Sequence, residues 1–198
     1  MVNDEINSLI ELAELSGRNY FSRWEFLNAY SGCMIGNPAV SVVVDAYEKG
    51  IRNYDVEKAF SICKNTVDKF GNGELGYVPY NVEGSSTIFG AASISETLEY
   101  SYFDWCVGQF ARSLKKDSLA AEYFARSKNY VNIWNDEVKW FRSRDDKGGW
   151  APWEGKANMG ALGGQGCVES NPYQQGWFVP HDIPGLTELM GGKDSIRN

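Results

Sequence analysis

The residues able to carry out chemistry in this chain are mostly carboxylates and aromatic rings. His181 is the only histidine, and the four cysteines are widely spaced, with no C-x-x-C pair. Cys33, Cys63 and Cys106 stand among apolar neighbours, where buried thiols are expected. This pattern predicts no structural zinc site and no assignable disulfide. The chain also lacks a G-x-S-x-G turn and a phosphate-binding glycine motif, which disfavours Ser-His-Asp hydrolases and nucleotide chemistry.

Aromatic residues are abundant and point to a different ligand. The chain has 7 Trp, 11 Tyr and 10 Phe, or 14% of its residues, and several stand in glycine-rich polar stretches rather than in apolar ones. The formal net charge of −7 argues against a nucleic-acid binder, which needs a basic face. No apolar run approaches the ~18 residues of a membrane span. Exposed rings, loop carboxylates and an acidic surface suit a neutral polyhydroxy ligand such as a sugar.

The length of 198 residues suits one domain, because domains usually hold roughly 100–200 residues. Hydrophobic residues make up 43% of the chain and charged residues 23%, a composition that supports a sizeable core. Residues 1–5 are acidic and have no apolar segment after them, so no export signal is visible. The sequence itself therefore leaves the localisation unknown.

Helix signals fill the first part of the chain. Apolar residues recur at i, i+3, i+4 and i+7 from Ile6, which predicts an amphipathic helix over residues 4–15. Asn37-Pro38 is typical of an N-cap followed by proline in the first turn, and predicts a helix over 38–49. Asp55 is expected to cap a helix that ends near residue 70.

Two longer helices are expected next. The pattern Ser93-x-x-Glu96 is typical of a capping box and predicts a helix over 94–114. Asp117 is expected to cap another helix, whose apolar positions continue as far as Trp134. Together with the preceding segments, these helices favour a set of α-hairpins.

Loops and short elements make up the rest of the chain. Residues 71–92 and 155–166 are rich in glycine and are expected to form long loops, and such loops are often functional. Residues 139–153 favour a short β-hairpin around a D-D-K-G-G turn. Asn171-Pro172 repeats the signal of a cap followed by proline, and Asp182 is expected to cap a last helix. The sequence predicts an all-α fold whose long loops gather at one end.

Seven short stretches occur in an order and spacing that are typical of one enzyme family. They are S-G-C-M-I-G (31–36), D-A-Y-E-K-G-I-R (45–52), S-E-T-L-E-Y (95–100), D-W-C (104–106), V-E-S-N (168–171), W-F-V-P-H-D (177–182) and E-L-M-G-G (188–192). From Trp24 to Gly192 the chain resembles glycoside hydrolase family 92, the calcium-dependent exo-acting α-mannosidases.

The resemblance implies a fold larger than this chain. Family members have an N-terminal β-sandwich domain and a C-terminal (α/α)6 toroid, and residues 1–198 map onto the middle of the toroid. Nothing matches the sandwich, the W-D-T-Y-R-T-like stretch that opens the catalytic helices, or the later motifs resembling G-N-E-P-S-H and G-N-E-D-C-G-Q. By resemblance these later motifs hold the base carboxylate and most of the calcium site. We therefore expect a partial catalytic domain, with no metal ligands in this chain and an extracellular or periplasmic parent enzyme.

The resemblance also implies an inverting mechanism. A carboxylic acid protonates the leaving oxygen, and a carboxylate ~6.5–9.5 Å away activates water on the opposite face of the sugar. Glu169 matches the general acid of the family. Partial burial by Trp177 and Phe178 is expected to raise the pKa of Glu169 and keep its proton available. The alternative is a solvated loop carboxylate.

Four other residues are assigned to the substrate site. Trp24 matches a tryptophan that lines the sugar subsite in the family; the alternative is a core ring beside two phenylalanines. Asn171 and Tyr173 flank the acid and are expected to hydrogen-bond either the acid or the sugar, although Asn171 also fits a helix cap. Trp177 is expected to line the substrate site with them.

The remaining polar candidates have structural explanations. The capping box accounts for Glu96, and Glu99 is expected to orient its neighbours inside the toroid. Asp104 is expected to be a polar residue on a packed helix, and His181 a structural histidine. Residues 145–148 lack the alternating oxygen ligands and terminal glutamate of a calcium loop, so a simple turn is expected there.

Two classes of function follow from these observations. The first is part of an inverting exo-α-mannosidase that acts on α-1,2-linked mannose of glycans and depends on the remainder of the same enzyme. The second is a non-catalytic helical module that binds carbohydrate or another protein. A third possibility keeps the fold with another linkage or sugar, since fold does not fix substrate. About six helices make half a toroid, so the first class predicts uncovered apolar faces and self-association, and the second a stable monomer.

Overall fold

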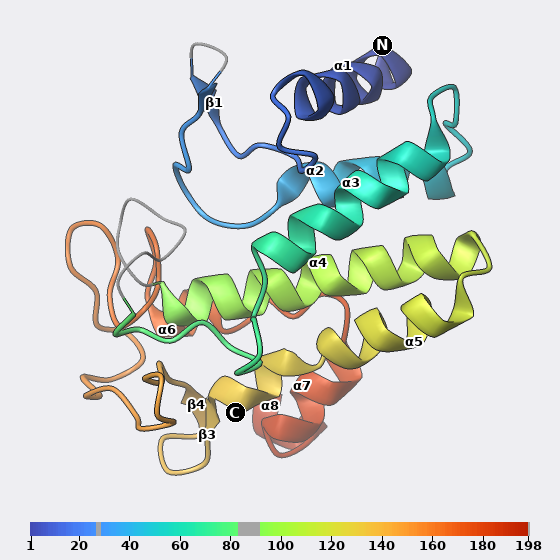
Figure 1. Cartoon of the computed structure of the whole chain (residues 1–198). Helices are drawn as coiled ribbons and strands as arrows, with labels where there is room; N and C mark the ends of the chain where they lie inside the picture. Colours follow the sequence, from blue (N-terminus) through green and yellow to red (C-terminus); the bar gives the residue numbers. More distant parts are fainter. Residues whose placement is uncertain (27–28, 83–91, 198) are drawn as a thin grey trace.

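The computed structural model describes residues 1–26, 29–82 and 92–197, and α-helices form most of its regular structure (Figure 1). The five longest are α1 (Val2–Leu15), α2 (Pro38–Glu48), α3 (Val56–Lys69), α4 (Ser93–Ser113) and α5 (Asp117–Arg126). Shorter helices follow: η1 (Asn129–Ile133), α6 (Pro172–Gln175), α7 (Ile183–Leu189) and α8 (Lys193–Arg197). The predicted all-α fold is confirmed.

Two small antiparallel pairs of strands accompany the helices. Strands β1 (Glu25–Phe26) and β2 (Ala29–Tyr30) form one pair, in which Glu25 lies opposite Tyr30. Strands β3 (Trp134–Asn135) and β4 (Trp140–Phe141) form the other, in which Trp134 lies opposite Phe141. Neither pair was expected from the sequence, because two-residue strands are too short to show alternation.

Helix α4 is the centre of the molecule. It runs between α3 and α5 (Figure 1) and packs against α2, α3, α5, η1 and α6. Most of its side chains are buried, from Ile94 and Leu98 to Phe110 and Ala111, and only one stripe, which includes Tyr102 and Gln109, is partly exposed. A helix that is buried over most of its surface is stable only when other elements cover those faces. The position of α4 therefore fixes where the surrounding helices and loops can lie.

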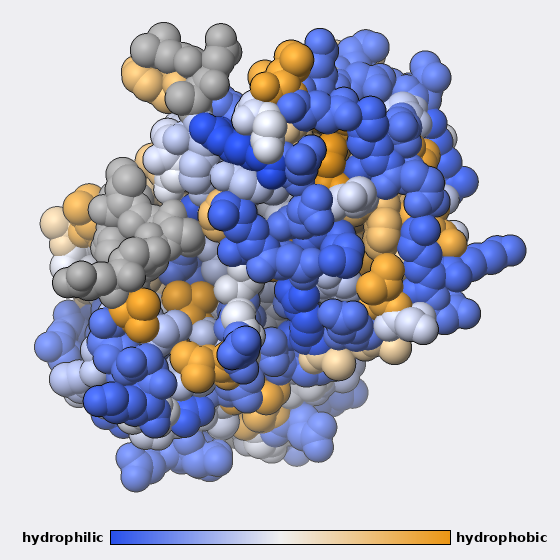
Figure 2. All heavy atoms as spheres, viewed as in Figure 1, coloured by the Kyte–Doolittle hydropathy of each residue, from blue (hydrophilic) through white to orange (hydrophobic). Residues whose placement is uncertain are grey.

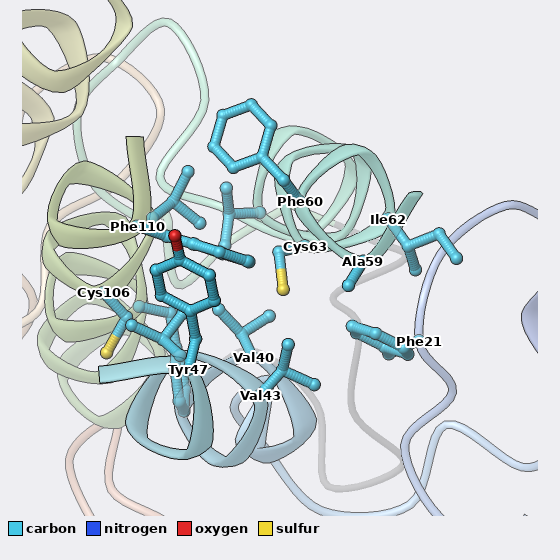
Figure 3. Packing of buried hydrophobic residues seen from close by; sticks show 14 of the residues in the cluster. Phe21, Val40, Val43, Tyr47, Ala59, Phe60, Ile62, Cys63, Cys106 and Phe110 are labelled. Carbon is cyan, nitrogen blue, oxygen red and sulfur yellow. The ribbon is translucent and has the colours of Figure 1, made fainter. Parts of the chain in front are cut away.

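Two apolar clusters lie beside α4. The helical core comes from α1 to α5; Figure 3 shows α2 side chains such as Val40 and Val43 meeting Cys63 of α3. The aromatic core lies under the loops and includes Tyr130, Trp134, Trp140, Phe141, Cys167 and Val179. The helical core thus belongs to a scaffold of helices, and the aromatic core belongs to the loop-rich end of the chain.

The set of buried cysteines differs from the set that the sequence predicts. Cys63 and Cys106 are buried as predicted, but Cys33 is only partly buried and Cys167 is buried instead. The helical core covers the first two, whereas the aromatic core covers Cys167. Burial raises the pKa of the Cys106 and Cys167 thiols to about 12, which leaves both thiols protonated at neutral pH.

Several helix caps follow the sequence. The carboxylate of Asp55 accepts a hydrogen bond from Lys58 N at 3.0 Å, and that of Asp182 accepts one from Gly185 N at 3.2 Å. Asn37 is the N-cap of α2, but its side chain donates to Phe70 O at 2.8 Å instead of capping the helix. A partner from another helix has replaced the local cap there.

The predicted capping box at Ser93 and Glu96 is wrong. The N-cap of α4 is Ala92, no side chain caps it, and Glu96 is fully buried and accepts a bond from Tyr100 Oη at 3.3 Å. A backbone carbonyl caps the helix instead, because Ile94 N and Ser95 N donate to Gly166 O at 3.0 and 3.1 Å. A distant loop thus closes the start of α4.

The predicted helix from Asp117 to Trp134 is also wrong in its cap and its extent, because Lys116 is the N-cap of α5 and no side chain caps the helix. Helix α5 ends at Arg126, and η1 and β3 follow. Asn132 in η1 donates to Gly76 O at 3.0 Å, a contact with a distant loop. Such tertiary contacts override helix propensity over a short segment.

The loops lie mainly at one end of the helix bundle, as expected, on the left of Figure 1, where α2 and α4 begin. The turn predicted around Asp145 is present: Ala151 N donates to Ser143 O at 2.9 Å, and Arg144 pairs with Trp150. The segment Trp140–Phe141 pairs with β3 instead of continuing that hairpin. Part of the predicted loop 71–92, residues 83–91, lies outside the described residues.

The surface is mixed. Figure 2 shows hydrophilic side chains over most of one face, with apolar ones scattered between them. The large exposed apolar residues include Leu15, Phe26, Val42, Leu162, Ile183 and Ile196. In the described part of the chain, no helix is both long and apolar enough to cross a membrane.

Candidate active site

A tight loop presents Glu169 to solvent. Glu169 N donates to Leu162 O at 3.0 Å, and Gly164 N donates to Ser170 O at 3.2 Å. Gly163 has φ +114, and a Cβ there would overlap the carbonyl of Cys167. The loop can close in this way only with glycine at that position. The backbone around Glu169 is therefore fixed by the glycine-rich sequence that precedes it.

The Glu169 backbone has φ 50, in the left-handed region that non-glycine residues seldom adopt. Its side chain is exposed, and within the described residues its carboxylate makes no hydrogen bond or ion pair. The expected partial burial by Trp177 and Phe178 is wrong, because those rings pack elsewhere. Trp177 packs against Trp140, and Phe178 against Tyr102. Glu169 is thus a solvated loop carboxylate in this chain, held in an unusual conformation.

Two residues that the sequence analysis missed anchor this loop from below. Ser95 is fully buried on α4, and its hydroxyl accepts a hydrogen bond from Val168 N at 3.1 Å. The same hydroxyl donates to Gln175 Oε1 at 3.0 Å, and Ser170 Oγ donates to that oxygen at 3.2 Å. Val168 and Ser170 flank Glu169, so α4 and α6 hold both sides of the acid. The only sequence signal was the polar residue Ser95 beside Glu96 on an otherwise buried helix.

Asn171 serves as a helix cap. Its side chain accepts from Gln174 N at 2.9 Å, and Gln174 Oε1 accepts from Asn171 N at 3.2 Å. Asn171 Nδ2 also donates to Ala157 O at 3.2 Å. These contacts support the cap interpretation rather than a hydrogen bond to Glu169.

Tyr173 and Trp177 come together in an open aromatic pocket. Tyr173 stacks on Trp140 with ring centroids 5.7 Å apart, and Trp177 lies edge-on to both rings. The Lys156 ammonium lies 4.8 Å from the Trp140 ring centroid and 5.1 Å from that of Tyr173. These side chains line a cavity of about 270 Å³ that Met190 and Ile196 close from the other side.

Trp24 lies elsewhere, at the start of the β1–β2 hairpin. Its side chain is 65% exposed, so the alternative of a core ring beside Phe21 and Phe26 is wrong. Its backbone has φ 50, and its carbonyl accepts hydrogen bonds from Ser31 N at 3.1 Å and Ser31 Oγ at 2.5 Å. The hairpin and the orange loops that precede α6 project from the same end of the bundle (Figure 1).

Two of the other candidates lie on α4, where the charge of a buried arginine acts on one of them. Glu96 is fully buried, Glu99 lies one turn further along α4, and Arg23 is 3% exposed. Burial raises the pKa of Glu99 to about 7; Arg23 opposes this rise, and Glu96 adds to it. The expected role of Glu99 in orienting its neighbours stays a prediction.

Asp104 and His181 support the scaffold. Asp104 is 1% exposed and lies 2.8 Å from Arg126 Nη2. His181 Nε2 contacts Ser127 O at 2.9 Å, and its ring packs against Tyr102 and Tyr130. Burial lowers the pKa of His181, so a neutral ring is favoured at neutral pH. These contacts give both residues structural roles.

The described residues do not fit a calcium site. No three of their histidine, cysteine, aspartate and glutamate side chains gather within reach of one ion. The carboxylate of Asp145 accepts bonds from Lys147 N at 2.9 Å and Gly149 N at 2.7 Å, so it closes a turn.

Comparison with known proteins identifies the wider context. Residues 1–198 match the model of the glycosyl hydrolase family 92 catalytic domain. An uncharacterized secreted glycosidase from Arthroderma benhamiae is 30% identical over 197 residues, which cover 81% of this chain and 25% of the relative.

Solved structures agree with that match. The family GH92 α-mannosidase BT3965 from Bacteroides thetaiotaomicron, in complex with mannoimidazole, superposes with a TM-score of 0.87 at 31% identity, over 99% of this chain and 26% of that chain. The family GH92 inverting mannosidase BT2199 from the same species gives 0.82 at 32% identity, over 97% and 26%. The chain thus spans about a quarter of the length of these relatives.

Proposed function

Because this chain belongs to glycosyl hydrolase family 92, we propose that it is part of the catalytic domain of an inverting exo-α-mannosidase that cleaves α-1,2-linked mannose from glycans. The similarity to a mannosidase that binds mannoimidazole and to one that inverts supports this proposal. The observation that carries it is the position of Glu169, a solvent-facing carboxylate fixed by backbone bonds at the loop end of the bundle.

In this mechanism Glu169 acts as the general acid. It transfers its proton to the glycosidic oxygen while the bond between that oxygen and the anomeric carbon breaks. A water molecule, deprotonated by a base carboxylate, forms the new bond from the opposite face, and the anomeric configuration inverts. Ser95 and Gln175 hold the backbone on both sides of Glu169, so the acid meets the leaving oxygen in a fixed orientation.

The base and the calcium site belong to the remainder of the same enzyme. The described residues gather no cluster of metal ligands, and they give the Glu169 carboxylate no hydrogen-bond partner. The chain alone is therefore expected to be inactive.

Trp24 supplies an exposed ring as one wall of the sugar subsite. Ring faces suit the apolar C–H face of a pyranose because both partners lose water on contact. Tyr173 and Trp177 present further exposed ring surface in the aromatic pocket. We assign Trp24 to the sugar that is cleaved, and Tyr173 and Trp177 to more distant parts of the glycan.

The test uses the whole open reading frame that contains this chain, with Glu169→Gln as the variant. Mannosyl-α-1,2-mannose has a poor leaving group, so its kcat/KM should fall roughly 10²–10⁴-fold. A dinitrophenyl α-mannoside needs no protonation of its leaving group and should lose far less. Glu154→Gln, a second exposed loop carboxylate, is the control and should retain activity. Equal losses on both substrates would remove Glu169 from the acid role.

Two further measurements define the specificity. NMR of the first product should show β-mannose, as inversion requires, and α-1,3- and α-1,6-linked mannobioses should react more slowly than the α-1,2-linked one. The purified 198-residue chain with calcium should not hydrolyse mannosyl-α-1,2-mannose. Turnover that Glu169→Gln abolishes would show that the base lies within this chain.

The aromatic pocket favours a second candidate function, a carbohydrate-binding module without catalysis. Its stacked rings and about 270 Å³ suit one sugar residue. That function predicts a monomeric chain that binds methyl α-mannoside and loses binding on Tyr173→Ala. Self-association of the isolated chain without mannoside binding would favour the enzyme fragment instead.

A further inference from the structure

Arg23 ties the β1–β2 hairpin to the helices. It directly precedes Trp24 and is 3% exposed, although most arginines lie on protein surfaces. Its Nη2 donates to Tyr30 Oη on β2 at 2.9 Å, and its Nη1 donates to Gly36 O at 3.4 Å. One side chain thus connects the entry to β1, strand β2 and the turn that leads into α2.

Glu99 converges on the same place from α4. A Cβ at Gly36 would overlap Glu99 Oε2, so the carboxylate lies directly against the glycine whose carbonyl binds Arg23. Gly36 has φ +80, a conformation that also favours glycine. Arg23 and Glu99 are opposite charges in an environment with little water, where their attraction is stronger than at the surface.

The Trp24 ring itself has little to hold it. Its side chain is 65% exposed, and its carbonyl is fixed by Ser31 N and Ser31 Oγ. The orientation of the ring therefore depends on the backbone at Trp24 more than on ring packing. That backbone is fixed on one side by Ser31 and on the other by the buried side chain of Arg23.

We propose that Glu99, acting through Arg23, is a positioning residue that sets the orientation of Trp24. The consequence for sugar binding rests on the proposed function, whereas the coupling between Glu99 and Trp24 does not. Glu99 touches neither the sugar nor the reacting atoms in this scheme. It acts at Gly36, where its carboxylate lies against the glycine whose carbonyl accepts from Arg23.

The first test measures Trp24 directly in the 198-residue chain. The seven tryptophans are labelled with 5-fluorotryptophan, and the Trp24 signal in the ¹⁹F NMR spectrum is assigned by Trp24→Phe. Glu99→Gln should shift or broaden that signal. The control is Asp104→Asn, which changes another buried carboxylate of α4 that faces an arginine; it should leave the Trp24 signal unchanged. An unchanged signal in Glu99→Gln would overturn the proposal.

The second test uses pH. The groups that face Glu99 are Arg23, from the segment before β1, and Glu96, on α4 itself. Tyr30 Oη on β2 contacts Arg23 Nη2. The Trp24 signal should titrate with a midpoint near 7, persist in Asp104→Asn and be absent in Glu99→Gln. A midpoint that persists in Glu99→Gln would assign the effect to Glu96 and overturn the proposal.

A third variant covers the case in which Glu99→Gln does not fold. Arg23→Lys keeps the charge but loses the two-pronged contact with Tyr30 and Gly36. It should speed hydrogen exchange at the Ser31 amide, which donates to Trp24 O, at least several-fold, and should move the Trp24 signal. Normal exchange and an unmoved signal would overturn the proposal without any use of Glu99→Gln.

The whole open reading frame connects this coupling to catalysis. Glu99→Gln should raise KM for mannosyl-α-1,2-mannose about 3- to 10-fold with a smaller change in kcat, because a misplaced subsite wall weakens substrate and transition state alike. Glu169→Gln should lower kcat instead. If the enzyme cleaves no mannoside but the Trp24 signal still responds to Glu99→Gln, the proposed function fails and the coupling stands.

Discussion

Asp104 and Glu99 lie little more than one turn apart on α4, and burial raises the pKa of each carboxyl to about 7. Each faces an arginine, yet their surroundings differ. Arg126, the partner of Asp104, also binds Asp68 Oδ1 at 2.6 Å. Arg23 acts on Glu99 through its charge, and its guanidinium contacts a tyrosine hydroxyl and a backbone carbonyl, while Glu96 on α4 acts in the opposite direction.

The two carboxylates belong to different regions: Asp104 lies in the helical scaffold, and Glu99 lies at the loop end of the bundle. The Asp104 network joins α3, α4 and α5: Asp68 on α3 accepts from Tyr123 Oη at 2.7 Å and pairs with Lys64 at 2.7 Å. The Glu99 group instead connects α4 to irregular chain. Four of the seven left-handed non-glycine residues in the described part of the chain lie in these loops, with Trp24 and Met34 near Arg23 in sequence, and Gln165 and Glu169 in the other loop. Strained backbone of this kind persists only where its surroundings determine it.

The largest effect is expected in the scaffold network. Arg126→Met should lower the free energy of unfolding by about 3–5 kcal/mol at pH 8, because it leaves the buried Asp104 carboxylate without its partner. Urea denaturation measures the loss. Arg112→Met is the control, since Arg112 is exposed and lies over the Phe124 ring at 5.6 Å, and it should cost less than about 1 kcal/mol. Equal losses would mean that the Asp104 pair adds little to stability.

At the loop end of the bundle, adding a methyl group at Gly36 should lower the stability of the chain. Gly36→Ala should destabilise the chain by about 2–3 kcal/mol, because its Cβ would overlap Glu99 Oε2 in addition to the strain at φ +80. Gly50→Ala has the same strain at φ +81 with nothing within 4 Å, and should cost only about 1 kcal/mol. Adding Glu99→Ala to Gly36→Ala should recover part of the difference. A double variant as unstable as the sum of both changes would contradict this account.

The two carboxylates should also make stability depend on pH. The folded-state pKa of Asp104 lies above its ordinary value of 3.8, so the folded chain binds the proton more tightly than the unfolded chain does. Stability is therefore highest below about pH 4 for this group and falls as the pH rises to about 7, by up to ~1.4 kcal/mol per pH unit. Asp104→Asn should flatten that slope in urea melts at pH 5 and 7. Glu99→Gln should flatten it less, because water reaches Glu99 more easily.

The helices could be predicted where their signals are local. Asp55 and Asp182 cap their helices through their own side chains, and apolar periodicity located α1. The start of α4 could not be predicted, because its cap is the carbonyl of Gly166, far along the chain. The pattern Ser93-x-x-Glu96 has the spacing of a capping box. Glu96 is instead buried in the centre of the fold, where its carboxylate accepts a hydrogen bond from Tyr100 Oη.

The sequence indicates which residues belong to the candidate site, but not how they are arranged. Glu169 and Trp24 were named through the family resemblance, but no pattern shows that Glu169 is exposed or that Tyr173 and Trp177 share a pocket with Trp140. Ser95 carries no sequence signal beyond being polar on a buried helix. Its contact with Val168 joins residues that are distant in sequence, and a single sequence does not reveal such pairs.

The smallest effect on stability is expected at Trp24, and it separates the two regions most clearly. Trp24→Ala should change the free energy of unfolding by less than about 0.5 kcal/mol, because an exposed ring loses little burial. In the whole open reading frame the same variant should raise KM for mannosyl-α-1,2-mannose about tenfold or more. Phe26→Ala, which removes a 71% exposed ring from the same hairpin, should change neither quantity. A large loss of stability in Trp24→Ala would mean that the ring belongs to the scaffold, and its exposure would then serve folding rather than sugar contact.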